Sequence, residues 1–213
     1  MANYEPSTVD TVAQIKHYYH VYRHTEEIER KSLFFSPNCM QICRSTPSYA
    51  ATSRDGIAQY LQDAQQGNIP VYAPASSPAV ISDLSGDHMT GSGPRTTKLP
   101  KSRSVYTIRT LHQSEFEFGS DDIVAPVGYT VKQLKSKAIR EEWIGMRVNL
   151  WEEGVERDLL KKVQYWWRLE EIPDHEQMGS DPLRRSWRQC LHDIIFIGPR
   201  DGTENEDRLE VFE

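Results

Sequence analysis

Long apolar runs are missing from this chain of 213 residues. A membrane-spanning helix needs roughly 20 consecutive apolar residues, and no such stretch occurs. The first residues also lack a basic segment followed by an apolar one, so no secretory signal is expected. We therefore predict a cytoplasmic protein that has no membrane partner.

Cysteine is scarce, with only Cys39, Cys43 and Cys190 in the whole chain. Their number is odd, their spacing is wide, and no CxxC pair occurs. This pattern argues against a disulfide framework and agrees with a reducing compartment.

No metal-binding motif such as HExxH is present either. His17, His20 and His24 would share one face of a helix, and Glu27 follows one turn later. That face lies roughly opposite the apolar stripe of the same helix, so we interpret it as solvated polar surface. We therefore expect no metal site.

An excess of positive charge is absent as well, because the formal net charge is −6. A general nucleic-acid binder needs a basic surface to neutralise phosphates, so no nucleic-acid partner is expected. The chain also lacks GxGxxG, P-loop and GxSxG motifs. We therefore expect any chemistry to proceed without a nucleotide or redox cofactor.

Helices are predicted in the first third of the chain. Over residues 8–24, Val12, Ile15, Tyr19 and Tyr22 are spaced by three and four, which puts them on one helical face.

A short helical turn over residues 26–32 and a short strand over 39–43 follow this helix. A second long helix begins after Ser53, a favourable N-cap, has Asp55 in its first turn, and ends near Gly67.

Two segments differ from the rest in composition. Residues 68–104 hold five of the twelve prolines together with Ser- and Gly-rich stretches, which indicates a low-complexity insertion, either disordered or a lid. Residues 203–213 form an acidic tail that we expect to be disordered. We interpret residues 1–213 as a single domain that carries both segments.

Strands dominate from residue 105 onwards. The pattern predicts a bent strand or hairpin over 105–118, a helix over 130–143, and strands over 146–151, 159–170 and 187–197. Helices followed by neighbouring strands favour an α+β fold with an antiparallel sheet.

This order resembles the SnoaL-like branch of the nuclear transport factor 2-like superfamily. The resemblance rests on the tyrosine-rich first helix, on Phe34-Phe35-Ser36-Pro37-Asn38, and on Ser53-Arg54-Asp55-Gly56-Ile57-Ala58-Gln59-Tyr60-Leu61. It implies a cone-shaped, curved antiparallel sheet wrapped around the N-terminal helices, with a pocket inside. The chain looks similar to filamentous-fungal members, which often serve natural-product pathways.

The last predicted strand contains His192 next to Asp193. Consecutive strand residues point to opposite faces, so only one of the two can face the inside of the cone. In SnoaL-like cyclases an acidic residue at a similar place acts as acid/base, so the resemblance favours Asp193 as the inner residue. The alternative is a structural Asp193 that pairs with an arginine.

The two preceding strands each have a polar and an apolar set of side chains. The polar sets are Arg147, Asn149 and Trp151, then Gln164, Trp166 and Arg168; the apolar sets are Met146, Val148 and Leu150, then Val163, Tyr165 and Trp167. If the apolar sets face inwards, the pocket is only core and the arginines are solvated. We favour the polar sets as the inner ones, where they would bind an oxygenated polycyclic ligand. The apolar sets would then form an exposed patch, which predicts a homodimer through the outer sheet face.

These patterns lead to a functional hypothesis. We expect a cofactor-independent isomerase, cyclase or dehydratase for a bulky polycyclic intermediate, with Asp193 or His192 as acid/base and with Arg168 and Arg147 stabilising an oxyanion. The expected substrate-binding residues are Tyr19, Tyr22, Asn149, Trp151, Gln164 and Trp166. The alternative is a non-catalytic module of the same fold that binds a small molecule or dimerises.

Overall fold

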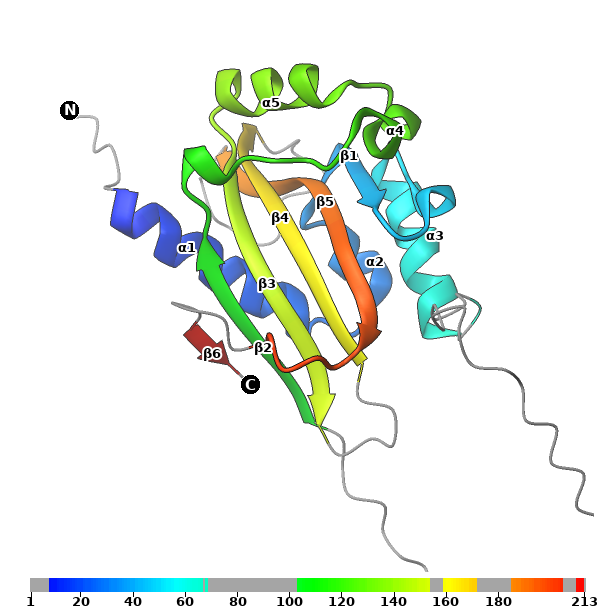
Figure 1. The fold of residues 1–213 in the computed structure, drawn as a ribbon. Coiled ribbons are helices and arrows are strands. Elements are labelled where there is room, and N and C mark those ends of the chain that lie inside the picture. The colour runs from blue at the N-terminus through cyan, green and yellow to red at the C-terminus, as the bar shows by residue number, and fades with distance from the viewer. Residues whose placement is uncertain are drawn as a thin grey trace, which may run out of the picture.

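An open, curved sheet of six strands forms the centre of the molecule (Figure 1). The computed structural model describes residues 8–66, 68, 103–153, 159–171, 185–204 and 210–212. In the order of the sheet, the strands are β1 (Phe35–Cys43), β5 (Arg185–Pro199), β4 (Leu159–Glu171), β3 (Ile144–Glu153), β2 (Arg103–Thr110) and β6 (Glu210–Phe212).

All neighbouring strands are antiparallel except β1 and β5, which are parallel. The expected α+β fold with a curved sheet is therefore confirmed, with one parallel pair that makes the sheet mixed.

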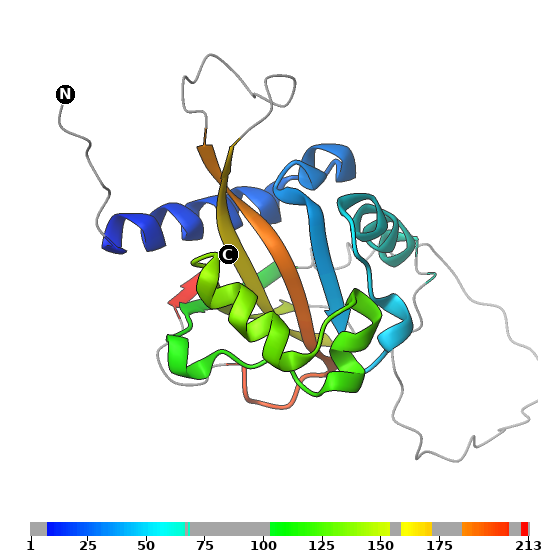
Figure 2. The ribbon, with the colours of Figure 1, turned by 90° about the horizontal axis from the view of Figure 1, so that it is seen from above.

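The helices cover both faces of this sheet. They are α1 (Thr8–His24), α2 (Ile28–Ser32), α3 (Arg54–Gln65), α4 (Asp121–Val124) and α5 (Val131–Arg140). Figure 2 shows α1 on one side of β4 and β5 and α5 on the other side. We call the face that packs on α1 the inner face and the face that packs on α4 and α5 the outer face.

The apolar stripe predicted for the first helix is buried as expected. Ile15 and Tyr19 are fully buried, and Tyr22 is nearly so. Together with α3 residues they complete an inner core against the sheet, whose strand residues include Tyr106, Met146, Val148, Val163, Tyr165 and Trp167.

Capping explains where the two other long helices begin. Ser53 accepts a hydrogen bond from the backbone N–H of Gly56 at 3.2 Å, which starts α3. Thr130 accepts one from Gln133 at 3.2 Å, and the Gln133 side chain accepts one from the Thr130 N–H in return. These caps satisfy N–H groups that have no partner within the helix.

The outer face has a core of its own, built by α4, α5 and the segment that leads to them. Its buried members include Leu111, Phe116, Phe118, Val124, Val127, Leu134, Ala138, Trp143, Trp166 and Leu191. Both faces of the central strands are therefore buried.

One predicted strand is shorter in the structure. The stretch predicted as a bent strand or hairpin over 105–118 is a strand only to Thr110, and Gln113–Glu115 is a 3₁₀ turn. Glu115 receives hydrogen bonds from Arg109 and from the His112 backbone, which holds this turn.

The acidic tail is partly ordered, contrary to expectation. β6 pairs with β2, and Phe212 stacks on Tyr106 with ring centroids 5.4 Å apart. The open edge of β2 offers backbone hydrogen bonds, and this outweighs the acidic composition of the segment. The predicted 68–104 insertion lies almost entirely outside the described residues. No helix in the described ranges is long and apolar enough to cross a membrane.

Candidate functional site

His192 and Asp193 point to opposite faces of β5, and the inner one is His192. Its ring lies edge-on to Phe35 and Tyr165, with centroids 4.9 Å apart in each pair. Asp193 is fully buried on the outer side, where it meets Arg44. The expectation that Asp193 faces the inside of the cone is therefore wrong.

Asp193 forms a bidentate ion pair. Arg44 Nε lies 2.9 Å from Oδ1 and Nη2 lies 2.6 Å from Oδ2, and Arg44 also binds Glu117 at 2.8 Å. Burial raises the pKa of Asp193, although Arg44 acts in the opposite direction. This geometry corresponds to the structural alternative, an aspartate paired with an arginine.

The apolar strand sets, not the polar ones, face inwards. Met146, Val148, Val163, Tyr165 and Trp167 belong to the core around α1. Because α1 of the same chain covers this set, it is not the exposed patch that a sheet-mediated dimer needs. The preference for polar side chains inside the cone is therefore wrong.

The polar sets lie on the outer face. Asn149 donates to the backbone oxygen of Glu204 at 3.2 Å, and Gln164 is buried opposite Arg147 in the sheet register. Trp166 packs edge-on against Phe116 at 4.6 Å.

Trp151 lies in a small separate core, with the Arg200 guanidinium 5.0 Å from its ring centroid. None of these expected substrate-binding residues reaches the interior beside α1.

Arg168 is engaged by carboxylates on the outer face. It pairs with Glu170 and Glu141 and donates to Ser36 at 3.3 Å. Burial alone would lower its pKa, but the two carboxylates outweigh burial and raise it.

Arg168 also lines a pocket of about 220 Å³ under α5. The other lining residues are Asn38, Met40, Thr52, Val127, Tyr129, Lys137, Trp143 and Cys190.

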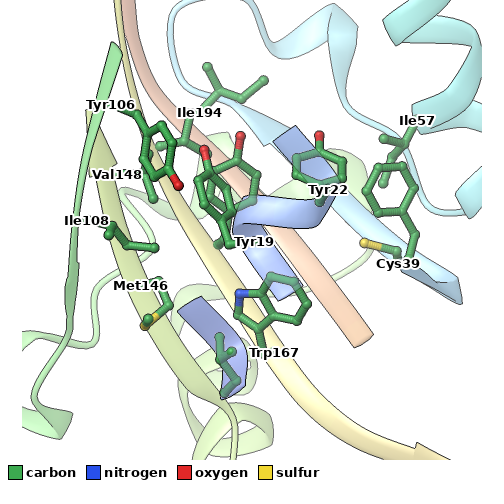
Figure 3. Close-up of a cluster of buried hydrophobic side chains, with 14 of the residues drawn as sticks. Tyr19, Tyr22, Cys39, Ile57, Tyr106, Ile108, Met146, Val148, Trp167 and Ile194 are labelled. Atoms are coloured by element: carbon green, nitrogen blue, oxygen red, sulfur yellow. The ribbon is translucent and has the colours of Figure 1, made fainter. Parts of the chain in front are cut away.

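The interior beside α1 holds a group of tyrosines. The ring of Tyr19 lies 5.0 Å from Tyr165, 5.3 Å from Tyr106 and 5.9 Å from Tyr22. Figure 3 shows Tyr19 and Tyr22 within this group, with Tyr106 beside Tyr19. Burial raises the pKa of Tyr19, Tyr22 and Tyr165, so all three are neutral hydrogen-bond donors at neutral pH. We call Tyr19, Tyr22, Tyr60 and Tyr165 the tyrosine cluster.

The hydroxyl of Tyr19 stands out within this cluster. It is buried and forms no hydrogen bond of standard geometry with a described residue, although the Tyr165 hydroxyl lies close enough to act on its pKa. A buried hydroxyl without a partner costs free energy, so such a group is typical of a site that a ligand or water completes.

Lys161 lies beside the tyrosine cluster, and its ammonium is 5.5 Å from the centroid of the Tyr60 ring. Burial lowers the pKa of Lys161 to about 8, and the charges of Arg23 and Lys31 contribute. Near neutral pH the free amine is a minor fraction of Lys161, but a far larger one than for an ordinary lysine, which makes Lys161 the described inner-face group best suited to accept a proton.

Two further cations border the cluster. Lys31 lies over Tyr22 with its ammonium 5.2 Å from the ring centroid, and Arg23 donates to Ser104 Oγ at 2.7 Å. Within the described ranges, Arg23, Lys31 and Lys161 form no ion pair with a carboxylate, in contrast to Arg44 and Arg168.

His192 is held as a neutral ring among these groups. Burial, with a contribution from Lys161, lowers its pKa to about 3. Its Nε2 is hydrogen-bonded to the side-chain amide of Gln189. His192 can therefore donate or orient but is a poor base.

The sequence reasoning found Tyr19, Tyr22 and His192 but missed Lys161, Arg23 and Lys31. The alternation of side chains along β4 could have identified Lys161. Lys161 lies two residues before Val163 and four before Tyr165, so its side chain shares their face of the strand. Once Tyr165 is known to face α1, the same alternation puts Lys161 on the inner face.

Comparison with known proteins agrees with this architecture. A family model described as a SnoaL-like domain matches residues 4–213. Neither the curated proteins nor the solved structures contain a match. Because the family model spans nearly the whole chain, the protein belongs to the SnoaL-like domain family.

Proposed function

We propose that this protein is a cofactor-independent acid–base enzyme whose reaction takes place at the tyrosine cluster. The reaction class is isomerisation, cyclisation or dehydration of a bulky polycyclic biosynthetic intermediate. The observation that carries the proposal is Lys161, a half-buried lysine whose pKa is lowered to about 8 beside neutral phenols. Family membership supports the reaction class, and the residues of the cluster support its location.

The chemistry begins with proton removal from carbon. The free amine of Lys161 takes a proton from a carbon next to a ketone, and the C–H electron pair moves into an enolate. The buried Tyr19 hydroxyl donates a hydrogen bond to the enolate oxygen, which lowers the barrier as the charge develops. The Lys161 ammonium then returns the proton to another carbon, or to a leaving hydroxyl in a dehydration.

Asp193 and Arg168 have a different role in this proposal from the one that the sequence suggested. Each is bound by a partner of opposite charge on the outer face, so we assign both to the stability of the sheet. Arg147 lies on that same face, opposite Gln164. His192 is retained at the site as a neutral residue that positions Tyr165.

A non-catalytic, small-molecule-binding module is the second candidate. It is favoured by the dense inner core, in which Tyr19, Phe35 and Trp167 are fully buried. Such a module would hold a ligand at the same cluster without moving a proton.

Deuterium exchange separates the two candidates. Cyclic ketones and 1,3-dicarbonyl compounds are incubated with the protein in D₂O, and isotope incorporation is followed by mass spectrometry. We expect exchange above the buffer rate that is lost in Lys161→Met and kept in Lys132→Met, a matched change at an exposed lysine of α5. Exchange that Lys161→Met leaves intact would overturn the role of Lys161, and binding without exchange would support the module.

A further inference from the structure

The inner site has a positive border whose two cations form no ion pair. Arg23 at the end of α1 and Lys31 in α2 are both half-buried, and neither forms an ion pair with any carboxylate that the structure describes. Other half-buried arginines of the chain, such as Arg44 and Arg109, bind carboxylates at 2.6–3.2 Å. Half-buried like charges repel each other. Two such cations without ion-pair partners are therefore typical of a site where an anion binds between them.

The two cations are electrostatically coupled to each other and to Lys161. Burial lowers the pKa of Lys31 and of Lys161; the charge of Arg23 adds to this effect on both lysines, and the charge of Lys31 adds to it on Lys161. The other titratable groups that face Lys161 are Cys43 and Tyr60, together with His192. The carboxylate of Glu152 acts electrostatically on Arg23, but it forms no ion pair with Arg23 or Lys31 within the described ranges.

The surroundings of Arg23 and Lys31 are aromatic and partly open. The ammonium of Lys31 lies over the Tyr22 ring, and a hollow of about 70 Å³ beside Arg23 is lined by His24, Ser104 and Tyr106. Tyr106 lines this hollow and Tyr22 lies under Lys31, and although both rings are nearly fully buried, a ligand at the border would meet aromatic side chains.

We propose that Arg23 and Lys31 form an anion subsite at the border of the tyrosine cluster. It takes an aromatic ligand that bears a carboxylate or an ionised enol, and it leaves Lys161 to face the ligand's acidic carbon. This inference names the substrate class of the proposed enzyme and rests on that proposed site. Binding at the subsite, however, can be measured without turnover.

The subsite also sets the basicity of Lys161. A bound anion cancels part of the field of Arg23 and Lys31, which raises the pKa of Lys161 and strengthens it as a base once the ligand is in place. A bound anion therefore makes the Lys161 amine a stronger base and also increases the share of Lys161 that is protonated at a given pH.

Calorimetric titration with three probes tests the subsite in the full-length protein. The probes are 2-naphthoate, neutral 2-naphthamide and the acidic enol 2-hydroxy-1,4-naphthoquinone. We expect the two anions to bind at least about tenfold more tightly than the amide, and only their affinity to fall as salt is added. Tight binding by one anion alone would identify which anionic group the subsite takes.

Variants assign the binding to the two cations. Arg23→Gln and Lys31→Gln should each weaken naphthoate binding by about tenfold, because each removes one charge-assisted contact. Arg23→Lys and Lys31→Arg should retain most of the affinity, and Lys132→Gln on α5 should retain all of it. Circular dichroism verifies that each variant is folded.

Three results would overturn the inference: equal affinity for naphthoate and naphthamide, no binding of any probe, or unchanged naphthoate affinity in both glutamine variants. Anion binding that persists while Lys161→Met leaves deuterium exchange unaffected would refute the proposed catalysis alone. The two ideas can therefore fail separately.

Discussion

The ammonium of Lys161 lies 5.5 Å from the centre of the Tyr60 ring, on the sheet face that packs against α1. The pKa of Lys161 is lowered to about 8 there, and this makes the pH dependence of turnover a direct test. A general base acts as the free amine, so the rate should rise as pH passes through about 8 and then level off. Lys161→Met should reduce the rate by roughly 10²–10⁴-fold, whereas Lys132→Met should not change it.

A rate that is independent of pH between 6 and 9 would exclude Lys161 as the base. Lys161→Arg serves as the second variant, because arginine keeps the positive charge but holds no free amine. It should bind anionic probes normally and still be inactive.

Tyr19 gives a prediction that separates stability from activity. Its buried hydroxyl lies near Tyr165 but has no hydrogen bond of standard geometry, so Tyr19→Phe should leave the free energy of unfolding unchanged or raise it by about 1 kcal/mol. The same change should lower turnover, because the enolate loses a donor. Urea denaturation and initial rates measure the two effects on one sample.

Tyr106→Phe is the matched control for Tyr19→Phe. The hydroxyl of Tyr106 is bound to His20 Nδ1 at 2.8 Å, so its removal should destabilise the protein by about 1 kcal/mol. A similar loss of stability in both variants would show that the Tyr19 hydroxyl does have a partner.

The Arg44–Asp193 pair is expected to be a major contribution to stability. Arg44→Met leaves the fully buried Asp193 carboxylate without its cation, which should cost roughly 3 kcal/mol in urea denaturation. Glu117→Gln, at the exposed end of the same network, should cost at most about 1 kcal/mol.

The Arg44→Met/Asp193→Asn double variant should recover part of the loss from Arg44→Met, because no buried charge is left unpaired. A loss below 1 kcal/mol in Arg44→Met would mean that the ion pair is not structural. Asp193 would then again be available as an acid/base.

His192 should make stability depend on pH in the acidic range. Its pKa is lowered to about 3 in the folded chain, against an ordinary value near 6.5, so the unfolded chain binds a proton that the folded chain does not. The contribution of the neutral His192 ring to the free energy of unfolding is therefore fully present above pH 6.5. It is lost as pH falls towards 3, and the free energy of unfolding then changes by at most about 1.4 kcal/mol per pH unit.

Denaturant unfolding between pH 4 and 7 measures this slope. His192→Gln removes the titrating group, so the slope of this variant should be smaller than that of the parent chain. Equal slopes in the two proteins would contradict a buried neutral histidine.

The helices and most strands could be predicted because their local signals are strong. Ser53 and Thr130 cap the helices that follow them, and the stripe of Ile15, Tyr19 and Tyr22 has a clear helical period. These features depend on residues a few positions apart. The fold class followed from their order along the chain.

The inward direction of the strands could not be predicted from alternation. Trp166 and Trp167 are neighbours on opposite faces of β4, and both are fully buried, because α1 covers one face and the α5 segment covers the other. Because both faces carry buried apolar side chains, the hydrophobic pattern does not show which face packs against α1.

The last strand adds a further difficulty. Cys190 and Ile195 have no partner residue in β4, so two bulges shift the alternation of β5. Cys190 consequently lies in the same outer core as Leu191, its neighbour in sequence. Pairings such as Arg44 with Asp193 join distant parts of the chain and leave no local signal.

The parallel pairing of β1 with β5 has a consequence for how the chain folds. Met40 lies opposite Leu191 and Cys43 opposite Ile194. The early strand β1 can therefore form this pairing only after β5, one of the last segments, has been synthesised. Contacts that join such distant residues close large loops and slow folding. The side chains of β1, Phe35 among them, therefore remain without their β5 partners until β5 has left the ribosome, and apolar surface is exposed to aggregation during that period.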